Sequence, residues 1–139
     1  MTDVSAAVRD FFAEFERNGN TRDLDAVANQ FADVFMSADP KGAVAVPRET
    51  FLAALPHRER LFATVGLTRT RLASIRETPL DDFYTLVDTD WIGELRDGGE
   101  LALSSTFILR REGESHVVVF YLNHQDIADV VQETAQRHH

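Results

Sequence analysis

The sequence predicts an α+β fold, in which N-terminal helices pack on a mostly antiparallel sheet and a short helix follows the sheet. Two observations carry this prediction. Apolar residues recur at helical spacing in much of the first 65 residues, and from residue 67 to 124 they follow strand periodicity between turn residues. A length of 139 residues is typical of one domain, so we expect a single domain over 1–139.

The first helix is expected over Asp3–Arg17, where six apolar residues follow helical spacing. Thr2 or Asp3 would be its N-cap, and Gly19 would end it. A second, short helix would start at Thr21 or Asp23 and is followed by a predicted strand, "QFADVFMSAD".

A small strand, "GAVAV", precedes the third helix. Pro47 suits the first position of this helix, because its missing N–H would have no helical partner there. We expect the helix to reach Val65 and to be kinked or split at Pro56.

Four long strands follow, separated by turn signals at Thr78-Pro79, Gly98-Gly99 and Gly113. A last helix is predicted from Asp126 to Gln136. The four strand segments are "LTRTRLASIRE", "FYTLVDTDWIGEL", "LALSSTFILRR" and "HVVVFYLN".

This order of elements resembles the nuclear transport factor 2-like superfamily, whose members include ketosteroid isomerase and the polyketide cyclases. The stretches that carry the resemblance are "FADVFMSAD", "VDTDWIGEL" and "SSTFILRREGESHVVVFYLNHQD". The resemblance implies a strongly curved sheet that forms a cone-shaped barrel with a pocket between sheet and helices. It also implies a homodimer through the outer sheet face. Function stays open, because superfamily members include enzymes and proteins that only bind.

The acids of "FYTLVDTDWIGEL" decide which face of that strand is buried. Asp88, Asp90 and Glu94 share the even positions, and burying unpaired carboxylates would cost several kcal/mol each. The odd set, which is Phe83, Thr85, Val87, Thr89, Trp91 and Leu95, is therefore predicted to face inward. The same test turns Leu101, Leu103, Ser105, Phe107 and Leu109 inward. Joining odd to odd positions across "RDGGE" needs a loop with an odd number of residues, or a bulge.

Arg69 and Arg71 leave two alternatives. On the outer face they could pair with Asp88 and Asp90 across strands, and this is the arrangement we expect. Pointing inward, they would form an anion-binding pocket.

The register of the final strand is also ambiguous, because both of its faces are apolar. A two-residue type II′ turn at Gly113-Glu114 favours the set of alternate residues that ends in His124 as the inward-facing one. It therefore predicts that His124 reaches the cavity near Ser105 and Trp91. That set is His116, Val118, Phe120, Leu122 and His124; a shift of one residue would select Val117, Val119, Tyr121 and Asn123 instead.

Composition excludes several classes of function. The net charge of −9 argues against general binding to nucleic acid or to an anionic membrane surface. With no cysteine, no apolar run long enough to span a membrane and no recognisable signal segment, the sequence indicates a cytoplasmic protein. No cofactor motif occurs, and the spacing of the histidines predicts no metal site.

Four polar side chains are candidates for chemistry, each with a structural alternative. His124 could act as a general base, or satisfy a backbone group at the strand end. Tyr121 or Asn123 could donate a hydrogen bond to a substrate, although Asn123 also suits a turn. Asp126 could orient a base, but is more typical of a helix N-cap. Asp33 is the remaining candidate for an inward-facing carboxylate. The stretch "PHRER" at 56–60 has two interpretations: it could be a solvated helix face, or it could be a cavity rim that receives an acid.

The leading hypothesis is a protein that binds a small, mainly apolar molecule without a cofactor. A cofactor-free lyase, isomerase or cyclase with His124 as base, and Tyr121 or Asn123 as donor, is the alternative. A dimeric interaction module with a filled cavity is the third. The ligand-binding residues we expect are Phe15, Phe35, Phe62, Trp91, Ser105, Phe107 and Phe120, with His124 beside them.

Overall fold

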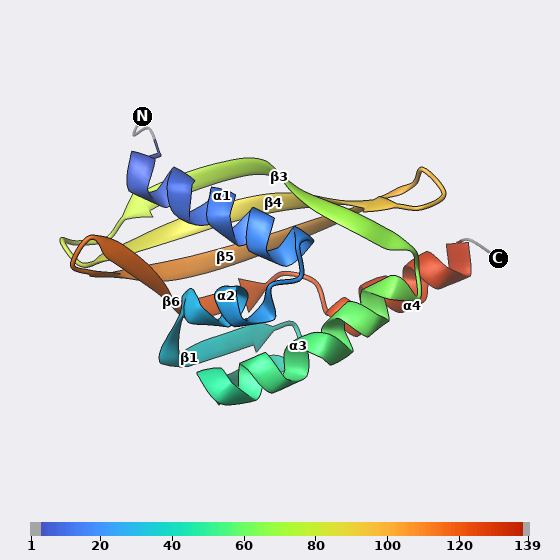
Figure 1. Ribbon diagram of the computed structural model, residues 1–139, viewed down its shortest axis with the longest axis horizontal. Helices are drawn as coiled ribbons and strands as arrows, with labels where there is room; N and C mark the ends of the chain where they lie inside the picture. The colour runs from blue at the N-terminus through green and yellow to red at the C-terminus, as the bar shows by residue number, and fades with distance from the viewer. Residues whose placement is uncertain (1–3, 138–139) are drawn as a thin grey trace.

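One six-stranded sheet and four helices make up residues 4–137, the part of the chain that the computed structural model describes (Figure 1). The strand order is β2-β1-β6-β5-β4-β3, and every neighbouring pair is antiparallel except β1 with β6. The elements are α1 (Ala6–Asn20), α2 (Leu24–Asn29), β1 (Phe31–Asp39), β2 (Gly42–Pro47), α3 (Arg48–Ala63), β3 (Leu67–Pro79), β4 (Tyr84–Leu95), β5 (Glu100–Glu112), β6 (Ser115–Asn123) and α4 (Ile127–Arg137). The predicted α+β fold, with helices first and the short helix last, is confirmed. None of the helices within residues 4–137 is long and apolar enough to cross a membrane.

Short polar side chains cap three of the helices. Asp23 accepts a hydrogen bond from the Ala26 N–H at the start of α2, and Asp126 accepts one from the Asp129 N–H at the start of α4. Both caps were predicted. The cap of α1 is Ser5, while the expected caps Thr2 and Asp3 lie outside the described residues.

The third helix begins one residue later than expected and is not split. Pro47 precedes α3 as its N-cap residue, and Pro56 lies within the single helix Arg48–Ala63. Of the two alternatives expected at Pro56, a kink or a split, the split is therefore wrong.

The inner face of β4 is the one that the acids predict. Thr85, Val87, Thr89, Trp91 and Leu95 are all buried, and the carboxylates of β4 lie on the opposite face. Phe83 is the exception. It precedes β4 and 53% of it is exposed, because the strand pairing begins only at residue 84.

Leu95 lies opposite Gly99, so three residues, 96–98, form the loop between these positions, as the odd-to-odd matching requires. The Leu95 N–H donates to the Gly99 carbonyl at 2.9 Å, and Gly98 has a φ of +93°, which glycine adopts without strain. The register then places Gly93 opposite Leu101. On β5, Leu101, Ser105, Phe107 and Leu109 are buried and Leu103 is half-buried, as predicted.

The β5–β6 hairpin has the predicted two-residue turn, with Gly113 at a φ of +65°. A bulge at Val119 then reverses the faces of β6. Val118 lies opposite Leu109 and is buried, but the next paired residue is Phe120, opposite Ile108. The predicted inward positions of Phe120, Leu122 and His124 are therefore wrong. Tyr121 and Asn123 take the inner face, because one unpaired residue shifts the alternation by one.

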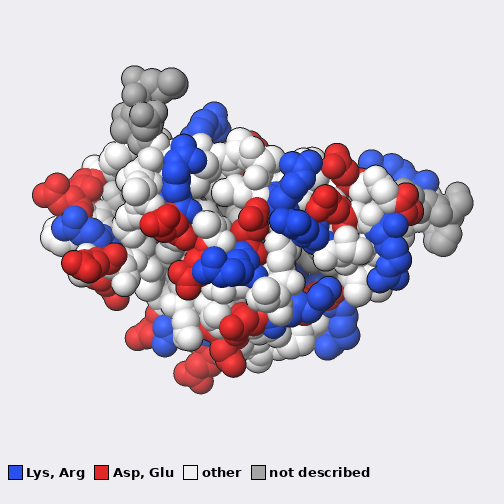
Figure 2. All heavy atoms as spheres, turned by 45° about the horizontal axis from the view of Figure 1, so that its top comes forward, with Lys and Arg blue, Asp and Glu red and all other residues white. Residues whose placement is uncertain are grey.

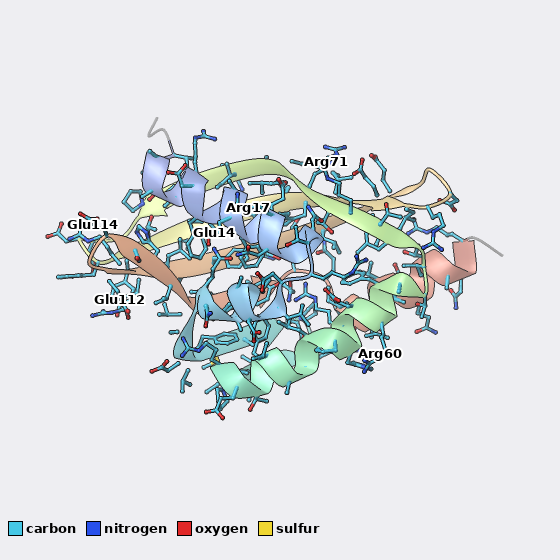
Figure 3. All side chains as sticks on the ribbon, in the orientation of Figure 1. Glu14, Arg17, Arg60, Arg71, Glu112 and Glu114 are labelled. Carbon is cyan, nitrogen blue, oxygen red and sulfur yellow. The ribbon has the colours of Figure 1, made fainter. Side chains whose placement is uncertain are left out.

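Two bulges also shift the register of β3 against β4, one at Thr68 and one at Ala73. Arg71 lies on the outer face, as expected, where it pairs with Glu100 at 3.3 Å. The predicted partners are wrong: Arg76 lies opposite Asp88, and Ser74 donates to Asp90 at 2.6 Å. Figure 3 shows Arg71 projecting from β3 away from the helices.

Glu77 of β3 ties the start of α1 to the sheet. Its carboxylate accepts the Ser5 N–H at 2.9 Å and the Thr85 hydroxyl at 2.7 Å. Burial opposes ionisation of this carboxyl, but the two hydrogen bonds outweigh burial and hold the pKa of Glu77 below its usual range.

We expect Glu77→Gln to lower the free energy of unfolding by about 1 kcal/mol at neutral pH, because two charge-assisted hydrogen bonds are weakened. A depressed carboxyl pKa stabilises the fold above the unfolded-state pKa, and this contribution disappears as pH falls through the folded-state pKa. The difference between wild type and variant should therefore shrink in acid. Urea unfolding at several pH values measures it, and a difference that is constant down to about pH 3 would contradict this role for the carboxylate.

Candidate functional site

A cavity of about 200 Å³ lies between the inner face of the sheet and helices α1, α2 and α3. Its size exceeds the engineered apolar cavity of about 150 Å³ that accommodates benzene in another protein, so it can accept a substituted ring. Aromatic side chains supply much of the wall. The aromatic lining residues are Phe15, Phe51, Phe62, Trp91, Phe107 and Tyr121.

Five of the seven residues predicted to bind a ligand border this cavity, namely Phe15, Phe62, Trp91, Ser105 and Phe107. The other two do not. Phe35 is on the inner face of β1 but only 2% exposed, because its ring packs on Phe31 at 4.6 Å and on Phe51 at 5.1 Å. Phe120 is on the outer face, beyond the bulge of β6.

The end of the cavity next to Asn123, the last residue of β6, carries hydrogen-bonding groups from β4, β5 and β6. The Ser105 hydroxyl donates to Asn123 Oδ1 at 3.0 Å, which leaves the Asn123 amide N–H groups unpaired within residues 4–137. Trp91 Nε1 donates to the Thr89 hydroxyl at 2.8 Å, so its ring is fixed and its N–H is already satisfied. The hydroxyl of Tyr121 makes no hydrogen bond within the described part of the chain. Asn123 and Tyr121 are thus the donors that this end offers to a ligand.

His124 does not reach the cavity. Its backbone N–H donates to the Ser104 carbonyl at 3.0 Å, and its Nε2 lies 2.7 Å from the Thr106 hydroxyl on the outer face. That hydroxyl is also 2.6 Å from Asp88 Oδ1. A carboxylate only accepts, so Thr106 donates to Asp88 and accepts from the Nε2–H of His124. The predicted position of His124 inside the cavity is therefore wrong.

The two aspartates considered for catalysis are also outside the cavity. Asp33 pairs with Arg48 at 3.0 Å, and 89% of its side chain is exposed. Asp126 caps α4 and pairs with Lys41 at 3.4 Å; the Asp129 N–H and Lys41 hold the pKa of Asp126 below its usual range. No cluster of three or more potential metal ligands occurs within residues 4–137.

Sequence reasoning missed Glu16, and for Arg58 and Glu59 it left open whether their stretch, "PHRER", forms a cavity rim or a solvated helix face; all three residues border the cavity. Glu16 of α1 accepts the Leu72 N–H, and Glu59 of α3 lies 3.8 Å from Arg22. Helical periodicity places these residues on particular faces, but the packing angle of each helix decides which faces meet the cavity.

Comparison with solved structures identifies the nuclear transport factor 2-like fold. A protein of unknown function from Shewanella oneidensis, described as similar to nuclear transport factor 2, has a TM-score of 0.71 at 14% identity, with 86% of this chain and 97% of that chain covered. A protein of unknown function with a cystatin-like fold, from Nostoc punctiforme, has a TM-score of 0.69 at 10% identity over 90% and 96% of the two chains. A nuclear transport factor 2-like protein of unknown function from Burkholderia pseudomallei has a TM-score of 0.58 at 16% identity, over 92% and 97%. No protein-family model and no curated protein matches the sequence. Identities this low establish the fold alone.

Proposed function

We propose that this chain, which has the nuclear transport factor 2-like fold, binds a small, mainly apolar molecule in the cavity between its sheet and its helices. One observation carries the proposal: a space of about 200 Å³ remains open between aromatic walls. Protein interiors are normally packed to crystal density, so an aromatic-lined space of this size is typical of a ligand pocket. A filled cone, as in a pure interaction module, would not leave it.

The polar groups in the cavity favour binding over catalysis. Tyr121 and Asn123 can donate hydrogen bonds that orient a ligand, which is the donor role that the sequence suggested for them. The carboxylates that border the cavity, Glu16 and Glu59, already hold a backbone N–H and an arginine. No histidine is among the described residues that border the cavity, so the base of the enzyme hypothesis, His124, is out of reach of a ligand there. Binding is therefore the function that this arrangement supports best.

Titration with 4-ethylbenzamide, a neutral substituted ring, tests the proposal. Trp91 is the single tryptophan of the chain and borders the cavity, so its fluorescence should change saturably as the probe binds. Calorimetry should give one site per chain. His124→Ala is the control, because His124 lies on the outer face, and its dissociation constant should match wild type within about twofold.

Absence of saturable binding, both for this probe and for the anion 4-ethylbenzoate, would contradict the proposed function. Binding by wild type that is lost in His124→Ala would place the site on the outer face of the sheet, where His124 lies.

A further inference from the structure

Arg58 is placed where a ligand in the cavity would meet it. It lies one helical turn before Phe62 on α3, so the two side chains share a face of that helix. The guanidinium carbon is 5.8 Å from the ring centroid of Phe62 and 5.8 Å from that of Tyr121. Arg58 is half-buried, and these two rings fix its position beside the aromatic wall.

This guanidinium has no ion pair within residues 4–137, although acids are near it. Glu59 is paired with Arg22, and Glu16 holds the Leu72 N–H. A guanidinium carries five N–H donors and cannot lose its charge, so a half-buried one favours an anion beside it. Figure 2 shows basic and acidic side chains interspersed over the visible face of the protein.

Two further open groups of the cavity match the same ligand chemistry. The hydroxyl of Tyr121 and the amide of Asn123 can both donate to an oxygen acceptor, and neither donates to a group in the described residues. Arg58, Tyr121 and Asn123 therefore offer donors, while the surrounding walls are apolar. A planar carboxylate suits a guanidinium best, because its two oxygens can accept two parallel N–H groups.

We infer that the ligand is a monocarboxylate with an apolar ring or short chain, and that Arg58 binds its carboxylate at the cavity while the apolar part lies among the aromatic walls. This inference rests on the proposed function and adds the chemical class of the ligand. Arg58 is then the residue that determines specificity for an acid over a neutral molecule of the same shape.

A matched pair of probes tests this inference. 4-Ethylbenzoate and 4-ethylbenzamide have the same shape and differ in charge, and calorimetry at low salt gives the dissociation constant of each. Wild type should bind the benzoate about tenfold or more tightly, as expected for a partly desolvated charged pair. Arg58→Gln should reduce this preference to about twofold or less and change the affinity for the amide little.

Arg60→Gln is the control. Arg60 is two residues away on α3, exposed and not among the cavity residues, and Figure 3 shows it pointing away from the body of the protein. This variant should keep the wild-type preference. Arg58→Lys retains the charge without the planar fork, should keep part of the preference, and provides a second variant if the glutamine variant fails to fold.

Each result decides between the two proposals. Equal binding of both probes by wild type would overturn the role of Arg58 and leave the proposed function standing. An equal loss of preference in Arg60→Gln would show attraction by the general surface charge and would also overturn it. Binding of neither probe would overturn the proposed function itself.

Discussion

Phe12→Ala is expected to lower the free energy of unfolding by about 3–5 kcal/mol, which is a large share of the total for a domain of this size. Phe12 is fully buried, with 0% of its surface exposed. Its ring contacts Phe11 at 5.1 Å, Phe15 at 5.9 Å and Phe107 at 5.0 Å, and so joins α1 to the inner face of β5. Removing the ring takes away one of the aromatic contacts that pack α1 against the sheet and leaves a cavity there.

Urea unfolding followed by circular dichroism measures this loss. Phe83→Ala is a matched control, because it removes the same ring from a position that is 53% exposed, and it should cost no more than about 1 kcal/mol. A similar small loss in Phe12→Ala would mean that α1 does not cover the sheet in the way described.

Leu103→Trp is expected to weaken binding of 4-ethylbenzamide at least about tenfold while the chain stays folded. Leu103 is on β5, borders the cavity and packs against two groups of buried apolar residues, one containing Phe107 and the other Leu101. A larger ring at this position can enter the open space, so the usual strain of overpacking a core, about 1–3 kcal/mol, should be reduced. The indole would then occupy the space that the ligand needs.

The control for this experiment is Leu86→Trp. Leu86 is half-buried on the outer face of β4, where it lies opposite Ile108. The same change in size there should leave the dissociation constant of the probe within about twofold of wild type. If Leu103→Trp binds the probe as tightly as Leu86→Trp does, the ligand is not in this cavity.

Residues that are costly to place elsewhere made the central strands and their turn predictable. The acids Asp88 and Asp90 identify the outer face of β4, because burying an unpaired carboxylate costs far more than exposing an apolar side chain. The glycine at 113 identifies the turn, since its φ of +65° is unfavourable for other residues. Strong local costs of this kind leave a clear signal in a single sequence.

The register of β6 left no such signal. Val118, Val119 and Phe120 are all apolar, so the sequence does not show which of them is the unpaired residue of a bulge. An error of one position moved His124 to the cavity and Tyr121 to the outside in the prediction. The bulges of β3 likewise shifted its pairing with β4, so that Arg71 lies opposite Ile92 and not opposite Asp88 or Asp90.

The sequence left the position of Arg58 open between a cavity rim and a solvated helix face, for a different reason. Its helix carries basic residues at 58 and 60, and the sequence does not distinguish the one at the cavity from the one in solvent. That distinction depends on how α3 packs across the sheet, where Leu55 and Phe62 are its buried residues. Tertiary packing of this kind involves residues distant in sequence, so local patterns do not show it.

Intermolecular nuclear Overhauser effects from bound 4-ethylbenzoate test the central claim most directly, since they report which protein protons lie beside the probe. We predict contacts from its ring and ethyl protons to the indole of Trp91 and the ring of Tyr121, both of which border the cavity. Contacts confined to Phe120 or Tyr84, on the opposite face of the sheet, would contradict the claim that an open cavity beneath the helices binds the ligand.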